Sequence, residues 1–242
     1  MTLSPNEAGT EPIPIGLRSE QPEERNRLTA ALRLIWVIPQ FIVLSIVGIA
    51  AFFVLVASWF VTLFTGEMPE WGENFLGGWL RWSTRVNGYF YFLTDAYPPY
   101  SLDEDPSYPI QIAIPPREPL NRLAVLFRII LVIPGAIVGS VIGAGIGLLS
   151  VGSWFMITFT GAQPIPLYEA TRVGIRYLTR LTGYFTMLTA AYPWGVLGDV
   201  QNAGETQTTS DDGWTIGLSN GGRTATIVAI VLGVLYVAYS NY

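Results

Sequence analysis

The amino-acid sequence predicts an all-α integral membrane protein with two tandem, parallel-related helical-hairpin repeats and a C-terminal transmembrane helix. Three observations predict this fold. Half of the 242 residues are hydrophobic and only 13% are charged, whereas a soluble domain carries about 25% charged residues. One long segment occurs twice without a gap. Each copy also contains an apolar stretch that is long enough to cross a bilayer.

The repeat begins at Asn26-Arg27-Leu28, which returns 95 positions later as Asn121-Arg122-Leu123. At the same offset, "SWF" at 58–60 returns at 153–155, "FTG" at 64–66 returns at 159–161, and "GYF" at 88–90 returns at 183–185. The repeat extends back to "IPIGL" at 13–17 and "YPIQI" at 108–112, where apolar residues alternate. Alternation of this kind is typical of β-strands. We therefore expect a short cytoplasmic strand before each repeat.

The apolar stretches cover 40–64 and 135–159, and a shorter one covers 224–240. At 1.5 Å per residue, a helix of this length is ample for a hydrocarbon core of about 30 Å. The predicted organisation is a polar tail at 1–12, repeat one at 13–107, repeat two at 108–199, a linker at 200–222 and a transmembrane helix at 223–242.

Each repeat also contains an amphipathic segment that carries two arginines four residues apart. Arg81 and Arg85 lie in segment 74–95, and Arg176 and Arg180 lie in segment 169–190. These segments either lie in the membrane interface or cross the membrane with their arginines facing inward. If they cross, Arg85 lies near the midplane, where an arginine costs about 2.5–3.5 kcal/mol.

Charge distribution favours crossing. Basic residues precede all three apolar stretches, and the positive-inside rule places them all on the cytoplasmic side. An even number of crossings per repeat satisfies this rule. The predicted topology has five spans in a plasma membrane, with the N-terminus cytoplasmic and the C-terminus outside. The repeats are then parallel, with a pseudo-two-fold axis along the membrane normal, and the strands at 13–17 and 108–112 share one side and could pair.

The four arginines have three possible roles. They could hydrogen-bond backbone carbonyls within the bundle, bind an anionic lipid headgroup or a carboxylate of a membrane partner, or line a path for an anion. We find no acidic residue within the apolar segments away from helix ends that would neutralise them. Arg81, Arg85, Arg176 and Arg180 are therefore the candidate residues for binding an anion, a lipid or a partner.

Composition argues against most enzymes. The chain contains no cysteine or histidine, and its thirteen basic residues are all arginine. Thiol nucleophiles, histidine acid–base chemistry and Cys/His metal sites are thus excluded, and we expect no cofactor and no catalytic residue. The acidic run Asp103-Glu104-Asp105 is typical of a solvated loop. Without a dense basic patch, nucleic-acid binding is not expected either.

The duplicated "VIP", "FTG" and "GYF" elements, together with "RWSTR", "YPP" and "YPIQI", resemble the prokaryotic membrane family catalogued as domain of unknown function 4389. The resemblance covers about 13–199. It implies a multi-pass, often duplicated membrane protein without an assigned activity. Family members often have histidine after the Ile-Pro pair, and here Gln40 and Gly135 occupy those positions.

These observations predict an accessory or scaffold subunit that binds membrane lipid, anionic lipid in particular, or a membrane protein partner, and that could form a homo-oligomer. The alternative is a small transporter or channel for an anion or a lipid.

Overall fold

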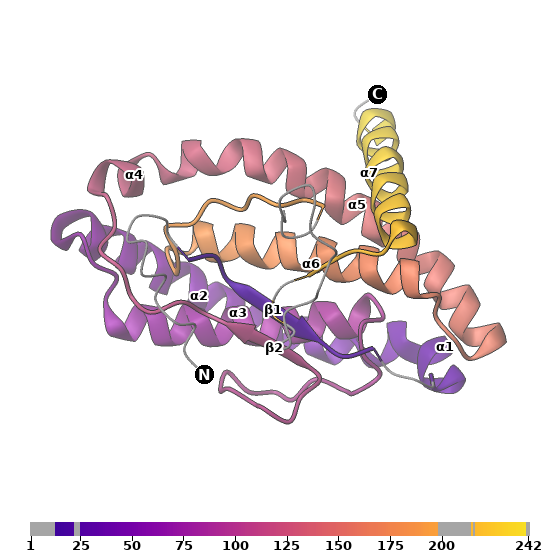
Figure 1. The fold of residues 1–242 in the computed structure, drawn as a ribbon. Coiled ribbons are helices and arrows are strands. Elements are labelled where there is room, and N and C mark those ends of the chain that lie inside the picture. The colour runs from indigo at the N-terminus through magenta and orange to yellow at the C-terminus, as the bar shows by residue number, and fades with distance from the viewer. Residues whose placement is uncertain (1–12, 22–24, 198–213, 215, 241–242) are drawn as a thin grey trace.

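The computed structural model describes residues 13–21, 25–197, 214 and 216–240, and Figure 1 shows the fold. The predicted tail at 1–12 and most of the predicted linker at 200–222 lie outside these residues. The elements in chain order are β1 (Gly16–Ser19), α1 (Arg27–Trp36), α2 (Ile38–Thr65), α3 (Glu70–Phe90), β2 (Ile110–Ala113), α4 (Arg122–Leu126), α5 (Arg128–Thr160), α6 (Ile165–Phe185) and α7 (Asn220–Ser240).

The repeated sequence motifs mark the ends of equivalent helices. The Asn26 side chain caps α1 by accepting a hydrogen bond from the Thr29 amide at 3.1 Å. Asn121 caps α4 in the same way through the Leu123 amide, at 2.9 Å. The long helices α2 and α5 end at Gly66 and Gly161 in the left-handed conformation, with φ of +84° and +78°. Glycine adopts this conformation without the steric cost of a side chain.

Within each repeat, the amphipathic helix folds back along the apolar one. In repeat one, the Trp82 indole of α3 donates to the Gln40 side chain at the start of α2, at 3.0 Å. Near the other end of the pair, Gly72 packs closely against Ser58. In repeat two, the Tyr177 hydroxyl of α6 donates to the Gly135 carbonyl of α5 at 3.1 Å. Both pairs are therefore antiparallel and in contact over most of their length.

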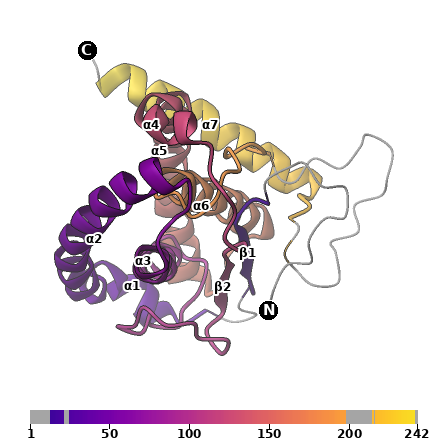
Figure 2. The ribbon, with the colours of Figure 1, turned by 90° about the vertical axis from the view of Figure 1, so that its left-hand side faces the viewer.

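The predicted strands pair with each other. β1 and β2 form an antiparallel two-stranded sheet in which Leu17 is opposite Ile112, so pairing of the two strand segments is confirmed. The sheet covers the side of α3 and α6 that faces away from α2 and α5, as Figure 2 shows. The isoleucine side chains at 15 and 110 pack against Gly183 of α6 and Gly88 of α3. The molecule thus has three layers: the sheet, the α3–α6 pair, and the two long apolar helices.

Equivalent residues make reciprocal contacts between the repeats. The Arg27 guanidinium donates to the Thr160 carbonyl at 3.1 Å, and the Arg122 guanidinium donates to the Thr65 carbonyl at 3.2 Å. Each repeat therefore begins beside the end of the other repeat's long helix, and α2 and α5 run in opposite directions. This pattern indicates an approximate two-fold axis that passes through the sheet and between α3 and α6.

Three of the described helices are long and apolar enough to cross a membrane: α2, α5 and α7. The helices α3 and α6 do not meet this criterion, because each carries several polar and charged residues. More than half of the residues in each are also buried within the protein. The prediction of five spans, with segments 74–95 and 169–190 crossing, is therefore not confirmed, and α2, α5 and α7 are the described helices that meet the criterion.

The last helix has a different direction from the other long helices. Figures 1 and 2 show α7 lying across α5 and α6, with its start on the side of the sheet and its end beyond α5. The crossing is close because it involves glycines. A Cβ atom on Gly145 would lie 2.2 Å from the Ala229 carbonyl oxygen, and one on Gly233 would lie 2.0 Å from the Val141 carbonyl oxygen. Small residues at such positions allow two backbones to approach.

Candidate anion-binding cavity

The first arginine pair lies against the acidic linker between α3 and β2. The Arg81 guanidinium donates to the Glu104 carboxylate at 2.7 Å, and the Arg85 guanidinium donates to the Asp103 carbonyl at 2.7 Å. The linker is polar, and Glu104 is exposed. The first arginine pair therefore contacts this linker and not the second pair. The pair faces the layer that holds the sheet.

The second pair lies in the same layer but makes different contacts. Arg180 donates to the Ile15 carbonyl at 2.9 Å, and Arg176 donates to the Gly195 carbonyl at 3.3 Å. The residues that meet at the centre of the molecule are Thr84 and Thr179, whose hydroxyls are 3.2 Å apart. Bonding to backbone carbonyls, one of the three predicted roles, thus applies to both pairs. The structure does not bring the four arginines into one common site.

A cavity of about 200 Å³ opens beside the first pair. Its wall combines one face of α3, the acidic linker, strand β2 and one indole from the segment before α7. The lining residues are Arg81, Arg85, Glu104, Asp105, Pro106, Gln111, Ile112, Ala113, Ile114 and Trp214. A volume of this size is sufficient for a phosphate or carboxylate group with part of the molecule that carries it.

The arginines at this cavity are not fully satisfied. Arg85 is only 3% exposed. Its Nη1 atom and the Nε atom of Arg81 are buried and have no hydrogen-bond partner among the described residues. Burial lowers the pKa of Arg85, and the nearby carboxylate of Asp105 opposes this shift. A guanidinium nevertheless stays protonated at neutral pH. Arg85 therefore presents a buried positive charge with a free donor.

The acids around the cavity are partly engaged elsewhere. Glu104 is bound to Arg81. Asp105 accepts hydrogen bonds from the side chain and the backbone of Ser107, and these bonds lower the pKa of the Asp105 carboxyl. The ring of Tyr108 lies 5.8 Å from the Arg85 guanidinium. Of the two arginines at the cavity, Arg85 is therefore the one without an ion pair among the described residues.

A second polar site, which the sequence reasoning missed, lies where repeat one meets the end of α5. We call Arg25, Arg33, Asp95 and Gln163 the buried ion network. Asp95 pairs with both arginines, at 3.1 Å from Arg25 and in close contact with Arg33. Gln163 also accepts from Arg25. Burial lowers the pKa of Arg25 and of Arg33, and the charge of Asp95 opposes both shifts.

Arg33 also holds the end of α3 in place. It is fully buried and donates to the carbonyls of Tyr89 and Thr94 at 2.7 and 3.0 Å. Its guanidinium lies 4.5 Å from the centre of the Tyr89 ring and 4.4 Å from that of Phe92. Phe92 has a φ of +64°, which is a costly conformation for a bulky residue. These contacts offset that cost.

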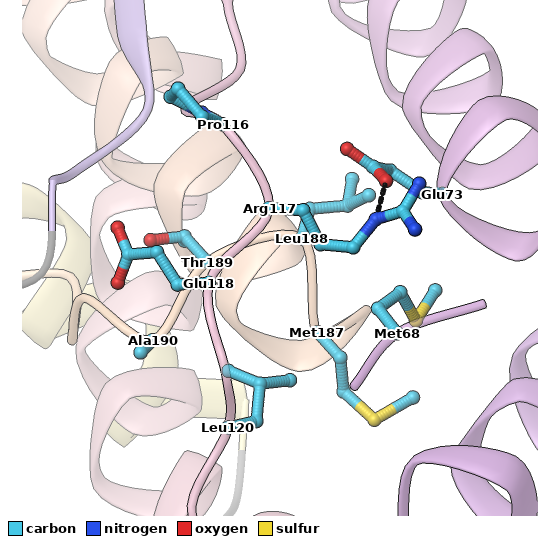
Figure 3. A pocket seen from close by; sticks show the side chains of 10 residues that line it. All are labelled: Met68, Glu73, Pro116, Arg117, Glu118, Leu120, Met187, Leu188, Thr189 and Ala190. Carbon is cyan, nitrogen blue, oxygen red and sulfur yellow. Dashed lines mark hydrogen bonds and ion pairs between the residues drawn. The ribbon is translucent and has the colours of Figure 1, made fainter. Parts of the chain in front are cut away.

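In repeat two, apolar residues stand at the three positions equivalent to Asp95, Arg25 and Gln163. Arg128 matches Arg33 and donates to the carbonyls of Tyr184 and Thr189, but Ala190 stands where Asp95 stands in repeat one. Figure 3 shows the result, a small hollow of about 10 Å³ in which Leu120, Met68 and Ala190 occupy the positions of Arg25, Gln163 and Asp95. A space of this size holds about one water molecule.

One ion pair lies at the rim of this hollow. The Arg117 guanidinium donates to the Glu73 carboxylate at 2.7 Å, as the dashed line in Figure 3 marks. The two side chains are partly exposed, so the pair ties the end of the strand layer to the start of α3.

Gln40 and Gly135, which follow the two Ile-Pro pairs, have packing roles. Gln40 is buried, donates to the Pro98 carbonyl at 2.6 Å, and accepts from the Trp82 indole. Gly135 leaves room for the side chains of Leu181 and Tyr192. Within the described part of the chain, no group of three or more His, Cys, Asp or Glu side chains could hold a metal ion.

Comparison with known proteins identifies the repeats. The family model "Domain of unknown function (DUF4389)" matches residues 27–101 and again residues 122–196. The two matched segments coincide with the two copies seen in the sequence. No curated protein and no solved structure matches the chain.

Proposed function

This chain belongs to the family defined by the domain of unknown function DUF4389, which it carries twice, and from this premise we propose that it is a membrane-bound accessory or scaffold protein that binds an anionic lipid headgroup at Arg85. The proposed location is a prokaryotic plasma membrane, with the sheet on the cytoplasmic side. The basic residues that lead into α2 and α5, such as Arg27 and Arg122, support this orientation through the positive-inside rule.

The observation that supports binding is the Nη1 atom of Arg85 beside the cavity, which has no hydrogen-bond partner in the described part of the chain. A buried neutral group without a hydrogen-bond partner costs about 1–3 kcal/mol of stability, and a charged donor without a partner costs more. A phosphate or carboxylate oxygen at this atom would remove that cost. Charge-assisted bonds of this type are about twice as strong as neutral ones.

The neighbouring groups suit a headgroup of modest size. Gln111 can donate to a second oxygen through its side-chain amide, which now donates to the Pro106 carbonyl. Ile112, Ile114 and Trp214 give the cavity an apolar wall that could contact the glycerol region of a lipid. Glu104 would compete with the ligand for Arg81, which limits the site to one strongly held anionic group.

The test is native mass spectrometry of the protein extracted from its host membrane in mild detergent. We expect anionic lipid to remain bound to the wild-type chain and to be lost from the Arg85→Leu variant. Arg180→Leu is the matched control, because Arg180 is the equivalent residue in repeat two and does not line this cavity. Arg85→Lys, which keeps the charge, should retain part of the lipid.

Other results would redirect the proposal. Equal lipid content in the wild type and Arg85→Leu would contradict lipid binding at this cavity. A stoichiometric protein partner that is lost on Arg85→Leu would replace lipid binding with a subunit role. Flux of an anion or lipid through reconstituted liposomes, abolished by the same variant, would support the alternative transporter or channel.

A further inference from the structure

The three apolar helices do not share a direction. α2 and α5 are antiparallel, as their reciprocal end contacts show. α7 lies across them, and in Figure 2 it runs from the sheet side to the opposite side while α2 and α5 are seen roughly end-on. One bilayer normal cannot lie along both directions. Either α2 and α5 are directed along the membrane normal, which we call upright, or α7 is.

The polar layer discriminates between these two arrangements. Strand β2 follows α3 over much of its length, because Ile114 packs at Gly77 and Ile110 packs at Gly88. The Arg81–Glu104 ion pair lies between these two points. If α2 stood upright, α3 and the strand layer beside it would also stand upright. The ion pair, with its exposed carboxylate, would then lie at the middle depth of the hydrocarbon, where charged groups are strongly disfavoured.

The exposed face of α2 has the composition expected for contact with lipid tails. Its buried positions are small or polar: Gln40, Ala51, Ser58 and Thr62. Its exposed positions include large apolar residues along the whole helix: Ile38, Ile42, Ile46, Ile49, Phe53, Phe60 and Phe64. The exposed face of α5 is also apolar, with Ile130, Ile133, Ile137, Val151, Phe155 and Phe159 among its members. A soluble protein has the opposite distribution of polar and apolar residues.

We infer that α2 and α5 lie in the plane of one leaflet, with the sheet facing water, and that α7 alone is directed across the bilayer. A helix is about 10 Å wide, whereas one leaflet provides about half of a 30 Å hydrocarbon core. A single layer of helices therefore fits within one leaflet. The apolar layer then contacts lipid, α3 and α6 lie at the interface, and the ion pairs remain in water. The two-fold axis lies along the membrane normal.

The test uses the absence of cysteine from the natural sequence, which makes every introduced cysteine unique. Glu67 follows α2 and Ala162 follows α5 at the equivalent, exposed position. Glu67→Cys and Ala162→Cys are labelled in sealed membrane vesicles of known orientation with a membrane-impermeant maleimide. Asn220→Cys, at the start of α7, marks the side of the sheet, and Tyr239→Cys marks the far end of α7.

The in-plane arrangement predicts that Glu67→Cys, Ala162→Cys and Asn220→Cys react from the same side. Labelling of Glu67→Cys and Ala162→Cys from opposite sides would overturn it, because antiparallel upright helices end on opposite sides. Spin labels at Ile38, Phe53 and Phe64 give a second readout of membrane depth through collisions with oxygen. Equal depths along α2 support the inference, and a maximum depth at Phe53 overturns it.

Discussion

The two repeats place the same arginine in the same position but surround it differently. Arg33 and Arg128 both donate to two carbonyls at the end of the following amphipathic helix. In repeat one, Asp95, Arg25 and Gln163 complete a buried ion network, whereas in repeat two the apolar residues Ala190, Leu120 and Met68 stand at these positions beside a small hollow. The carbonyl contacts are therefore the part that the fold requires. The ions are a feature of one repeat only.

The difference also shows how a buried arginine can be tolerated without an acid. Arg128 has its carbonyl acceptors and the Tyr184 ring, whose centre lies 4.1 Å from the guanidinium. Arg33 has equivalent contacts but a second arginine close by, so the two cations would repel each other without a carboxylate between them. We interpret Asp95 as the group that makes the presence of Arg25 possible. The predictions below test this interpretation and the equivalence of the repeats.

The largest effect is expected from Asp95→Ala. It leaves Arg25 and Arg33 buried without their shared anion, and breaking a buried ion pair in this way costs about 3–5 kcal/mol. Denaturant unfolding in detergent micelles measures the loss. The triple variant Asp95→Ala, Arg25→Leu, Gln163→Met copies repeat two and should recover most of the stability. A loss below about 1 kcal/mol for Asp95→Ala alone would contradict the role of the network.

Arg128→Met tests the contact that both repeats share. It removes the Arg128 donor from the carbonyls of Tyr184 and Thr189. The Tyr184 carbonyl keeps the Met187 amide at 3.1 Å, so the main loss is at Thr189, and a buried group that loses its partner costs about 1–3 kcal/mol. Hydrogen exchange should show faster opening at the C-terminal end of α6, with α3 little changed. Unchanged protection at the end of α6 would show that Arg128 does not hold this turn.

Gly88→Ala and Gly183→Ala test the packing of the sheet on α3 and α6. The new Cβ atoms would lie 2.1 Å from Cδ1 of Ile110 and 1.9 Å from Cδ1 of Ile15. Such overpacking costs about 1–2 kcal/mol, within the range seen for extra methyl groups in cores. Thermal unfolding should show similar losses for the two variants. Adding Ile110→Val to the first, or Ile15→Val to the second, should restore stability, and a failure to restore it would argue against this contact.

The smallest effect is expected at the centre of the molecule. Thr179 donates to the Ile175 carbonyl, so Thr84 is the donor in the Thr84–Thr179 pair. Thr84→Val removes this one bond and should cost about 0.5–1.5 kcal/mol. The double variant Thr84→Val, Thr179→Val should lose less than the sum of the losses of the two single variants, because each single variant already removes the bond between the two hydroxyls. A double-mutant cycle without coupling would contradict the hydrogen bond.

The sequence predicts the repeats, the apolar helices and the pairing of the two strands, because each leaves a local or periodic signal. It does not predict where the arginine face of segment 74–95 lies. An amphipathic pattern shows that a helix needs polar neighbours on one side, but a strand layer, a bundle interior and a lipid interface give the same pattern. The packing of Ile110 in β2 against Gly88, and of the following Ile114 against Gly77, distinguishes them, and these contacts involve residues distant in sequence.

The buried ion network is hard to predict for another reason. Ala190 stands at the position of Asp95 in repeat two, so comparison of the repeats does not indicate that Asp95 belongs to a site. Its partners Arg25 and Gln163 are distant along the chain, and only the reciprocal contact between the end of α5 and the start of repeat one brings them together. The Arg85 cavity is hard to predict for the same reason, because the acidic linker that borders it carries no recognisable motif and meets α3 only in the folded protein.

The central claim is that the amphipathic helices α3 and α6 separate a polar layer from a lipid-facing layer. Phe53 and the Glu104 side chain are each 65% exposed in the isolated protein, so their cysteine variants differ only in which layer they occupy. In proteoliposomes of mixed orientation with the maleimide on both sides, Glu104→Cys should react with the membrane-impermeant reagent, and Phe53→Cys should react only after detergent is added. Equal reaction of both without detergent, or protection of both, would contradict the account.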